Sequence, residues 1–156
     1  MTRQSLSDLL ERLATLVPVR KPAPQAEIHA VEQRLGIRIS DDFAFVYERL
    51  NGTTEPTLPE NGWFQLWRLD QWYTVEEYVR DWPERDRQAF RQISSAVVFA
   101  DYSLESYHFA ARFSGTSREQ ASPIFALTIK PYLVTESLGA FLASALVDGA
   151  EMYPQD

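Results

Sequence analysis

The chain has 156 residues, of which 45% are hydrophobic, 24% charged and 13% aromatic, and this is typical of one globular domain. Its formal net charge of −7 disfavours binding to nucleic acids, because their phosphate backbone repels an acidic protein. The absence of cysteine excludes disulfide bonds, a thiol nucleophile and thiolate metal ligands.

The N-terminal segment lacks the features of a secretory signal. Asp8, Glu11 and Arg12 interrupt its apolar residues, and no small-residue cleavage site follows them. No run in the chain approaches the roughly 20 consecutive apolar residues of a membrane helix. We therefore expect a soluble, cytoplasmic protein that does not bind membranes.

A first amphipathic helix is predicted near the N-terminus. Leucines recur with the helical period between Leu6 and Leu16, and Ser5 and Asp8 have the spacing of a capping box. The following segment PVRKPAPQ (18–25) is too rich in proline for a helix or a central strand. We expect this connector to link the neighbouring elements without packing on them.

Two further helices are predicted before residue 53. AEIHAVEQRLG (26–36) has apolar residues on one helical face, and Gly36 is expected to end that helix. Ser40 is expected to cap the helix DDFAFVYERLNG (41–52), which Asn51-Gly52 would end. Asp41 and Asp42 lie in its first turn, where the helix dipole favours negative charge.

Strands are expected in the second half of the chain. GWFQLWRL (62–69) predicts a buried strand, since both of its alternating faces are apolar. A capping box at Thr74 and Glu77 predicts a short helix after it. The runs AVVFADY, SYHFAARF, SPIFALTI and YLV predict an antiparallel meander, and TESLGAFLASALVDG predicts a final amphipathic helix. For WPERDRQAFRQ (82–92), a helical turn and an ordered loop both stay open.

This order of elements indicates an α+β fold. Because helices and strands come in blocks, we expect mainly an antiparallel sheet packed with N-terminal helices and a C-terminal helix. Residues 1–156 would form a single domain, with the first helix and connector at 1–24 and the core at 25–147.

The sequence offers little for catalysis or metal binding. His29 and His108 are its only histidines, and a strand hairpin would bring His108 close to Asp101, so a small hydrolase using this pair stays open. No Gly-x-Ser-x-Gly motif presents a nucleophile, no spacing of acidic residues predicts a metal site, and no glycine-rich motif predicts a phosphate site. We expect a non-enzymatic protein without cofactor or metal.

Aromatic and acidic residues are concentrated in one region. All four tryptophans lie within the twenty residues from Trp63 to Trp82, and residues 41–84 carry ten acidic against three basic side chains. Large rings dominate core packing, so one or two of the tryptophans, Trp63 or Trp67 first, should be buried. We expect Trp72 or Trp82 to lie on a contact surface whose acids attract a basic partner.

Residues 27–52, EIHAVEQRLGIRISDDFAFVYERLNG, carry a family resemblance. The succession of a helix, Leu-Gly, a short hook, an acidic helix start and Asn-Gly resembles the signature of the SUKH superfamily. This superfamily groups bacterial immunity proteins with Syd and with fungal regulators of cell-wall assembly and killer-toxin resistance. The later elements follow in the same order, so the resemblance spans about residues 25–147. Two positions depart from it: Thr53 replaces a common second glycine, and residues 103–105 replace a glycine-rich turn.

The resemblance implies a non-enzymatic binding protein with no catalytic residues. Our leading hypothesis is an immunity protein that neutralises a bacterial toxin effector. We expect this protein partner to be basic if it acts on nucleic acid. The alternative is a regulatory scaffold, as the fungal members suggest. The residues predicted to bind the partner are acidic or aromatic and come from residues 41–105: Asp41, Asp42, Glu55, Glu60, Trp72, Glu76, Glu77, Trp82, Asp101 and Glu105.

Overall fold

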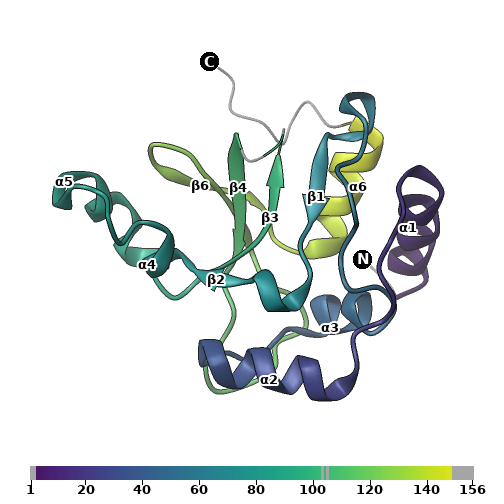
Figure 1. Ribbon diagram of the computed structural model, residues 1–156, viewed down its shortest axis with the longest axis horizontal. Helices are drawn as coiled ribbons and strands as arrows, with labels where there is room; N and C mark the ends of the chain where they lie inside the picture. Colours follow the sequence, from purple (N-terminus) through teal and green to yellow (C-terminus); the bar gives the residue numbers. More distant parts are fainter. Residues whose placement is uncertain (1–2, 103, 105, 149–156) are drawn as a thin grey trace.

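A six-stranded antiparallel sheet lies at the centre of the structure, a computed structural model that describes residues 3–102, 104 and 106–148 (Figure 1). The strands are β1 (Phe64–Leu66), β2 (Tyr73–Thr74), β3 (Val97–Tyr102), β4 (Tyr107–Ala111), β5 (Ile124–Leu127) and β6 (Pro131–Thr135). The α-helices are α1 (Arg3–Leu16), α2 (Gln25–Leu35), α3 (Asp41–Tyr47), α4 (Val75–Tyr78), α5 (Glu84–Arg87) and α6 (Leu138–Asp148), and the 3-10 helices are η1 (Pro59–Asn61), η2 (Leu69–Gln71) and η3 (Gln88–Ile93). The predicted α+β class is confirmed.

The strand order is β1-β3-β4-β5-β6, and β2 also pairs with β3. Strands β3 to β6 therefore form the predicted meander, while β1 and β2 share one edge of β3. In the register of this sheet, Asp101 of β3 lies opposite His108 of β4 and Gln65 of β1. A bulge between Ile124 and Phe125 shifts the pairing of β5 with β6, the edge strand.

Helix α6 covers one face of the sheet. The ring of Phe141 packs edge-on against Phe64, Phe99 and Phe109, with centroids 5.8, 5.8 and 4.9 Å away. Helix α1 packs on α6 rather than on the sheet, and Figure 1 shows it as the outermost helix on that side. No helix in the described part of the chain has the length and apolar character of a membrane span.

The N-terminal region differs from two expectations. Helix α1 already begins at Arg3, so Ser5 lies inside it and is not its cap. The connector packs as well as links: the N–H of Arg20 donates to Gly52 at 3.0 Å, and the N–H of Ala23 donates to Tyr47 at 2.9 Å. Because these backbone groups pair with the α3 region, the expectation of an unpacked connector is wrong.

The Asn-Gly pair, Asn51 and Gly52, contacts the end of β1 and the residues that follow it. Helix α3 ends at Tyr47, ahead of this pair, so ending the helix is not its role. Asn51 accepts a hydrogen bond from the N–H of Leu69 at 2.9 Å. Gly52 has φ 82°, and a Cβ there would lie 2.7 Å from the carbonyl oxygen of Leu66. Glycine is therefore required by a close backbone approach as well as by its dihedral angle.

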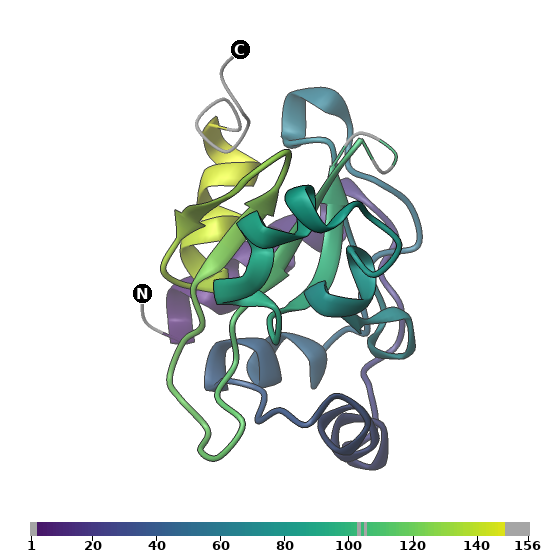
Figure 2. The same ribbon diagram turned by 90° about the vertical axis from the view of Figure 1, so that its left-hand side faces the viewer.

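Residues 82–92, for which the sequence allowed either a helical turn or an ordered loop, are largely helical. They form α5 and most of η3, and we call residues 75–93, from α4 to η3, the arm. Figure 2 shows the arm in front of the sheet, on the side away from α6. The predicted Thr74 cap is confirmed, since its hydroxyl oxygen accepts the N–H of Glu77 at 3.2 Å.

Candidate protein-binding surface

The face of the sheet opposite α6 carries a cluster of aromatic rings. Phe109 faces α6, so its neighbour His108 points to the opposite face, because side chains alternate along a strand. The His108 ring lies 5.1 Å from that of Tyr78 and 5.6 Å from that of Trp67, measured between centroids. Further contacts connect this cluster to Tyr73 and Trp82. We call these five residues, Trp67, Tyr73, Tyr78, Trp82 and His108, the aromatic ridge.

The arm fixes the outer part of the ridge. Val75 and Val79 of the arm are buried, and the N–H of Val75 donates to Ala96 at 2.8 Å, next to β3. Trp82 packs edge-on against the buried ring of Phe90, with centroids 5.4 Å apart. The Tyr78 and Trp82 rings are half-buried, so each keeps part of its surface open to a partner. Burial raises the pKa of the Tyr78 hydroxyl, which stays protonated at neutral pH.

Asp101 fixes the inner part of the ridge. Its carboxylate accepts a hydrogen bond from the indole N–H of Trp67 at 2.7 Å, and only 4% of the residue is exposed. It lies directly opposite His108, as the hairpin predicted. The sequence predicted Asp101 to bind the partner, but this buried carboxylate lies within β3, and its bond to the indole orients Trp67.

Two grooves border the ridge. The first, which we call the arm groove, measures about 710 Å³ and separates Tyr78, Trp82 and Asp86 from Leu127 and Ile129 of the β5–β6 hairpin. The second, the Trp67 groove, measures about 420 Å³. It is lined by aromatic, amide and carboxylate side chains: Gln65, Trp67, Gln71, Tyr73, Asp101, with Leu104 beside them. The aromatic ridge and the two grooves beside it are therefore a candidate surface for binding a protein partner.

A sequence model of the SMI1 / KNR4 family (SUKH-1) matches residues 22–144. The chain belongs to this family. Its members include immunity proteins and fungal regulators, and the family is generally non-enzymatic. The comparison with curated proteins gives no significant match. The SUKH-1 match begins in the connector and ends within α6, so it includes every strand of the sheet and the whole arm.

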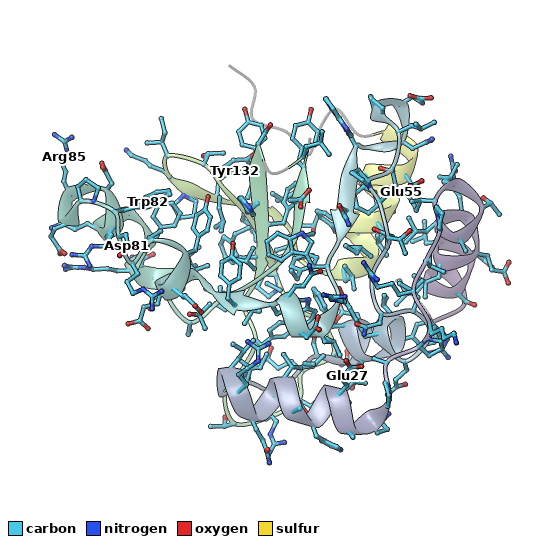
Figure 3. The ribbon with its side chains drawn as sticks, in the orientation of Figure 1. Glu27, Glu55, Asp81, Trp82, Arg85 and Tyr132 are labelled. Atoms are coloured by element: carbon cyan, nitrogen blue, oxygen red, sulfur yellow. The ribbon has the colours of Figure 1, made fainter. Side chains whose placement is uncertain are left out.

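In this SUKH-1 protein the predicted acidic residues do not form one face. Glu76 and Glu77 are exposed on α4, next to the ridge. Glu55 is exposed in the loop before η1, Glu60 is exposed in η1, and Asp41 is exposed at the start of α3. In Figure 3, Glu55 lies on the side of α6 and α1, whereas Asp81 lies on the arm at the opposite end. The charge of residues 41–84 is thus divided between distant parts of the surface.

Trp72 is a core residue, so its expected role as a surface anchor is wrong. Its side chain is 1% exposed, stacks on Phe113 and meets Phe43 and Tyr47 edge-on. Trp67 is also largely buried, whereas Trp82 is half-buried in the ridge. Trp67 and Trp72 therefore both lie in the core. The sequence predicted one or two buried tryptophans and named Trp67, but it did not name Trp72.

Asp42 has a structural role that its sequence position did not reveal. Its carboxylate accepts hydrogen bonds from the Ser40 hydroxyl at 2.5 Å, the Phe43 N–H at 2.9 Å and the Leu138 N–H at 2.9 Å. Burial raises the pKa of this carboxyl, although the hydrogen bonds lower it. A carboxylate engaged in this way is poorly placed to bind a partner. Glu105, also predicted to bind, lies outside the described residues.

The sequence reasoning missed several residues of this surface. Tyr73, Tyr78 and Asp86 were not singled out, nor were Leu127 and Ile129. Tyr78 is four residues before Trp82, a spacing that indicates one shared face if the segment is helical. Ile129 is the most exposed large hydrophobic residue described, at 85%, and only the folded hairpin reveals that it borders a groove.

Proposed function

We propose that this SUKH-1 protein is a non-enzymatic immunity protein that binds a protein toxin and blocks it by steric occlusion. The observation that carries the proposal is the aromatic ridge, in which every ring except that of Trp67 is half-buried, between two grooves. Tryptophan and tyrosine are the side chains most enriched among binding hot spots. The presence of immunity proteins in the family supports the same function.

Each part of this surface has a physical role in the proposal. The rings of Tyr78 and Trp82 supply large apolar contacts at a small entropic cost, because the arm already holds them. Glu76 and Glu77, exposed beside them, would accelerate the approach of a basic toxin. A stable complex buries about 800 Å² on each partner, so the interface would extend over both grooves and the ridge.

The hydrolase alternative receives less support. Asp101 and His108 are neighbours, but the Asp101 carboxylate accepts the Trp67 indole N–H, and the His108 ring lies between the rings of Trp67 and Tyr78. These contacts give both residues a role in building the ridge. The generally non-enzymatic character of the family agrees with that role.

Co-expression tests the proposal directly. The toxin-like product of a neighbouring gene is produced with and without this protein, and bacterial growth and copurification are measured. We expect protection and a stable complex, both lost in Tyr78→Ala and Trp82→Ala. Leu58→Ala is the matched control, because Leu58 is an exposed apolar residue, 57% accessible, in the loop near α6.

Two results would contradict the proposal. Absence of both protection and copurification would reject the immunity function. Protection that survives both ridge variants, with each variant shown to be folded, would reject the ridge as the binding surface. If crosslinking instead recovers many abundant host proteins, the regulatory scaffold becomes the better explanation.

A further inference from the structure

Among the residues that the structure describes, the arm groove combines an aromatic wall with one carboxylate, that of Asp86. From this combination we infer that it receives an arginine side chain of the protein partner, whose guanidinium packs on the rings of Tyr78 and Trp82 and pairs with Asp86. The inference deepens the proposed function and rests on it for the nature of the partner. It concerns the chemistry of one contact, and this can be tested without the toxin.

The dimensions of the arm groove suit a long side chain. Its volume of about 710 Å³ lies within the range of roughly 300–1,000 Å³ found for ligand-binding clefts. Leu127, 2% exposed, lies at its base, while Ile129, 85% exposed, forms the rim opposite the arm. The apolar methylene groups of an arginine can therefore be covered on two sides.

The aromatic wall exposes part of two ring systems to the groove, although the Tyr78 ring is also stacked on Tyr73. The centroids of Tyr78 and Trp82 are 5.4 Å apart and their planes are tilted by 54°, so the two faces are not stacked on each other. Both rings line the groove and both are half-buried. A guanidinium over such rings is attracted by their negative π faces, and this attraction grows as water is displaced.

Asp86 is the one carboxylate of the arm that lines the arm groove. Glu84 is bound by the guanidinium groups of Arg87 and Arg91, and these three residues line a different cleft, beside α4. Asp86 is paired with Arg85 through a contact of 3.8 Å, and 91% of the Arg85 side chain is exposed. Figure 3 shows Arg85 pointing outward from the end of the arm. A pair this exposed is weak, so an incoming cation can replace it.

Arginine fits this arrangement better than lysine. Its planar guanidinium stacks on aromatic faces and can donate two parallel hydrogen bonds to one carboxylate. A lysine ammonium would satisfy Asp86 as a point charge but would not stack on Trp82. The same side chain of a basic toxin would also be attracted by Glu76 and Glu77 on the adjoining helix.

Titration of the protein with N-acetyl-arginine amide tests the inference. The indole N–H signals of the four tryptophans are followed by NMR, and the Trp82 signal is assigned by its loss in Trp82→Phe. The matched probe is N-acetyl-citrulline amide, which has nearly the same shape but no charge. We expect a saturable shift of the Trp82 signal with the arginine probe, and affinity at least about fivefold lower for the citrulline probe.

Two variants give the inference its sharpest test. Asp86→Asn keeps the size of the side chain and should weaken arginine binding by about fivefold. Asp81→Asn removes an exposed charge next to Trp82 that does not line the groove, and it should leave binding within about twofold. The inference is overturned if the Trp82 signal does not shift, if citrulline binds equally well, or if the two variants behave alike.

The outcome is separable from that of the toxin experiment. Arginine binding that depends on Asp86, together with no toxin neutralisation, would reject the immunity function and keep the groove specificity. Neutralisation by both the native protein and Asp86→Asn, with no response to the arginine probe, would reject the arginine contact alone.

Discussion

The carboxylate of Asp42, in the first turn of α3, accepts a hydrogen bond from the backbone N–H of Leu138, the first residue of α6, at 2.9 Å. The same carboxylate accepts the N–H of Phe43 and the hydroxyl of Ser40. One side chain thus satisfies donors at the start of two helices that are far apart in sequence. It fixes the start of α6. This helix in turn holds Phe141 against the sheet face that it covers.

Asp42→Ala should therefore lower the free energy of unfolding by about 1–3 kcal/mol, because it leaves buried donors at two helix starts without an acceptor. Urea denaturation measures the change. Asp41→Ala is the control: Asp41 is exposed, and its replacement should alter stability by about 0.5 kcal/mol or less. Equal effects of the two substitutions would show that the bond to Leu138 does not stabilise the fold.

The raised pKa of Asp42 predicts a dependence of stability on pH. Burial disfavours the charged form, so the folded state holds the proton more tightly than the unfolded chain, whose carboxyl has a pKa near 3.8. The contribution of this proton to stability is complete below that value and is lost as pH rises through the folded-state pKa. The free-energy difference between the native protein and Asp42→Asn should thus favour the native protein most at low pH. Denaturation at a series of pH values from about 3.5 upward tests the sign, and a difference that grows with pH would contradict it.

Gly52→Ala should be among the most damaging single substitutions. A Cβ there would meet the Leu66 oxygen at 2.7 Å and the Arg68 nitrogen at 2.8 Å, and both are backbone atoms that cannot turn away. We expect a loss of about 3 kcal/mol or more. Gly36 also has a positive φ, 67°, but nothing lies within 4 Å of its added Cβ, so Gly36→Ala should cost only about 1–2 kcal/mol. Thermal or urea unfolding would contradict this reasoning if the two losses were the same.

Local chemistry explains what the sequence could predict. The Thr74 cap, the Gly36 helix end and the order of strands β3 to β6 depend on residues close in sequence, and each was recognised. The place of Trp72 depends on α3 and on Phe113 beyond β4, and it follows η2, where no periodic pattern shows which way a side chain points. The aromatic ridge was missed for the same reason, since it joins β4, the arm and the segment after β1.

The difference between Trp72 and Trp82 can be measured. Trp72→Ala should destabilise the protein by about 3–5 kcal/mol, because it empties a fully enclosed site among aromatic rings. Trp82→Ala should cost about 1–2 kcal/mol, since its ring is half-buried and packs mainly on Phe90 and Tyr78. Toxin neutralisation should be lost in Trp82→Ala at temperatures where this variant is folded. Equal stability losses would place both side chains in the core.

The divided acidic surface predicts which charges speed association with a basic partner. Glu76 and Glu77 lie beside the ridge, whereas Glu55 and Glu60 lie in the segment before β1 that contains η1. Charges farther away than the Debye length, about 10 Å at 0.1 M salt, contribute little to attraction. Replacing Glu76 and Glu77 by glutamine should slow association by roughly threefold at about 0.1 M salt and much less at about 1 M salt. The double change Glu55→Gln/Glu60→Gln removes the same charge and should leave the rate nearly unaltered. Stopped-flow mixing with the toxin measures both rates, and equal slowing by the two pairs would mean that only the net charge of the protein matters.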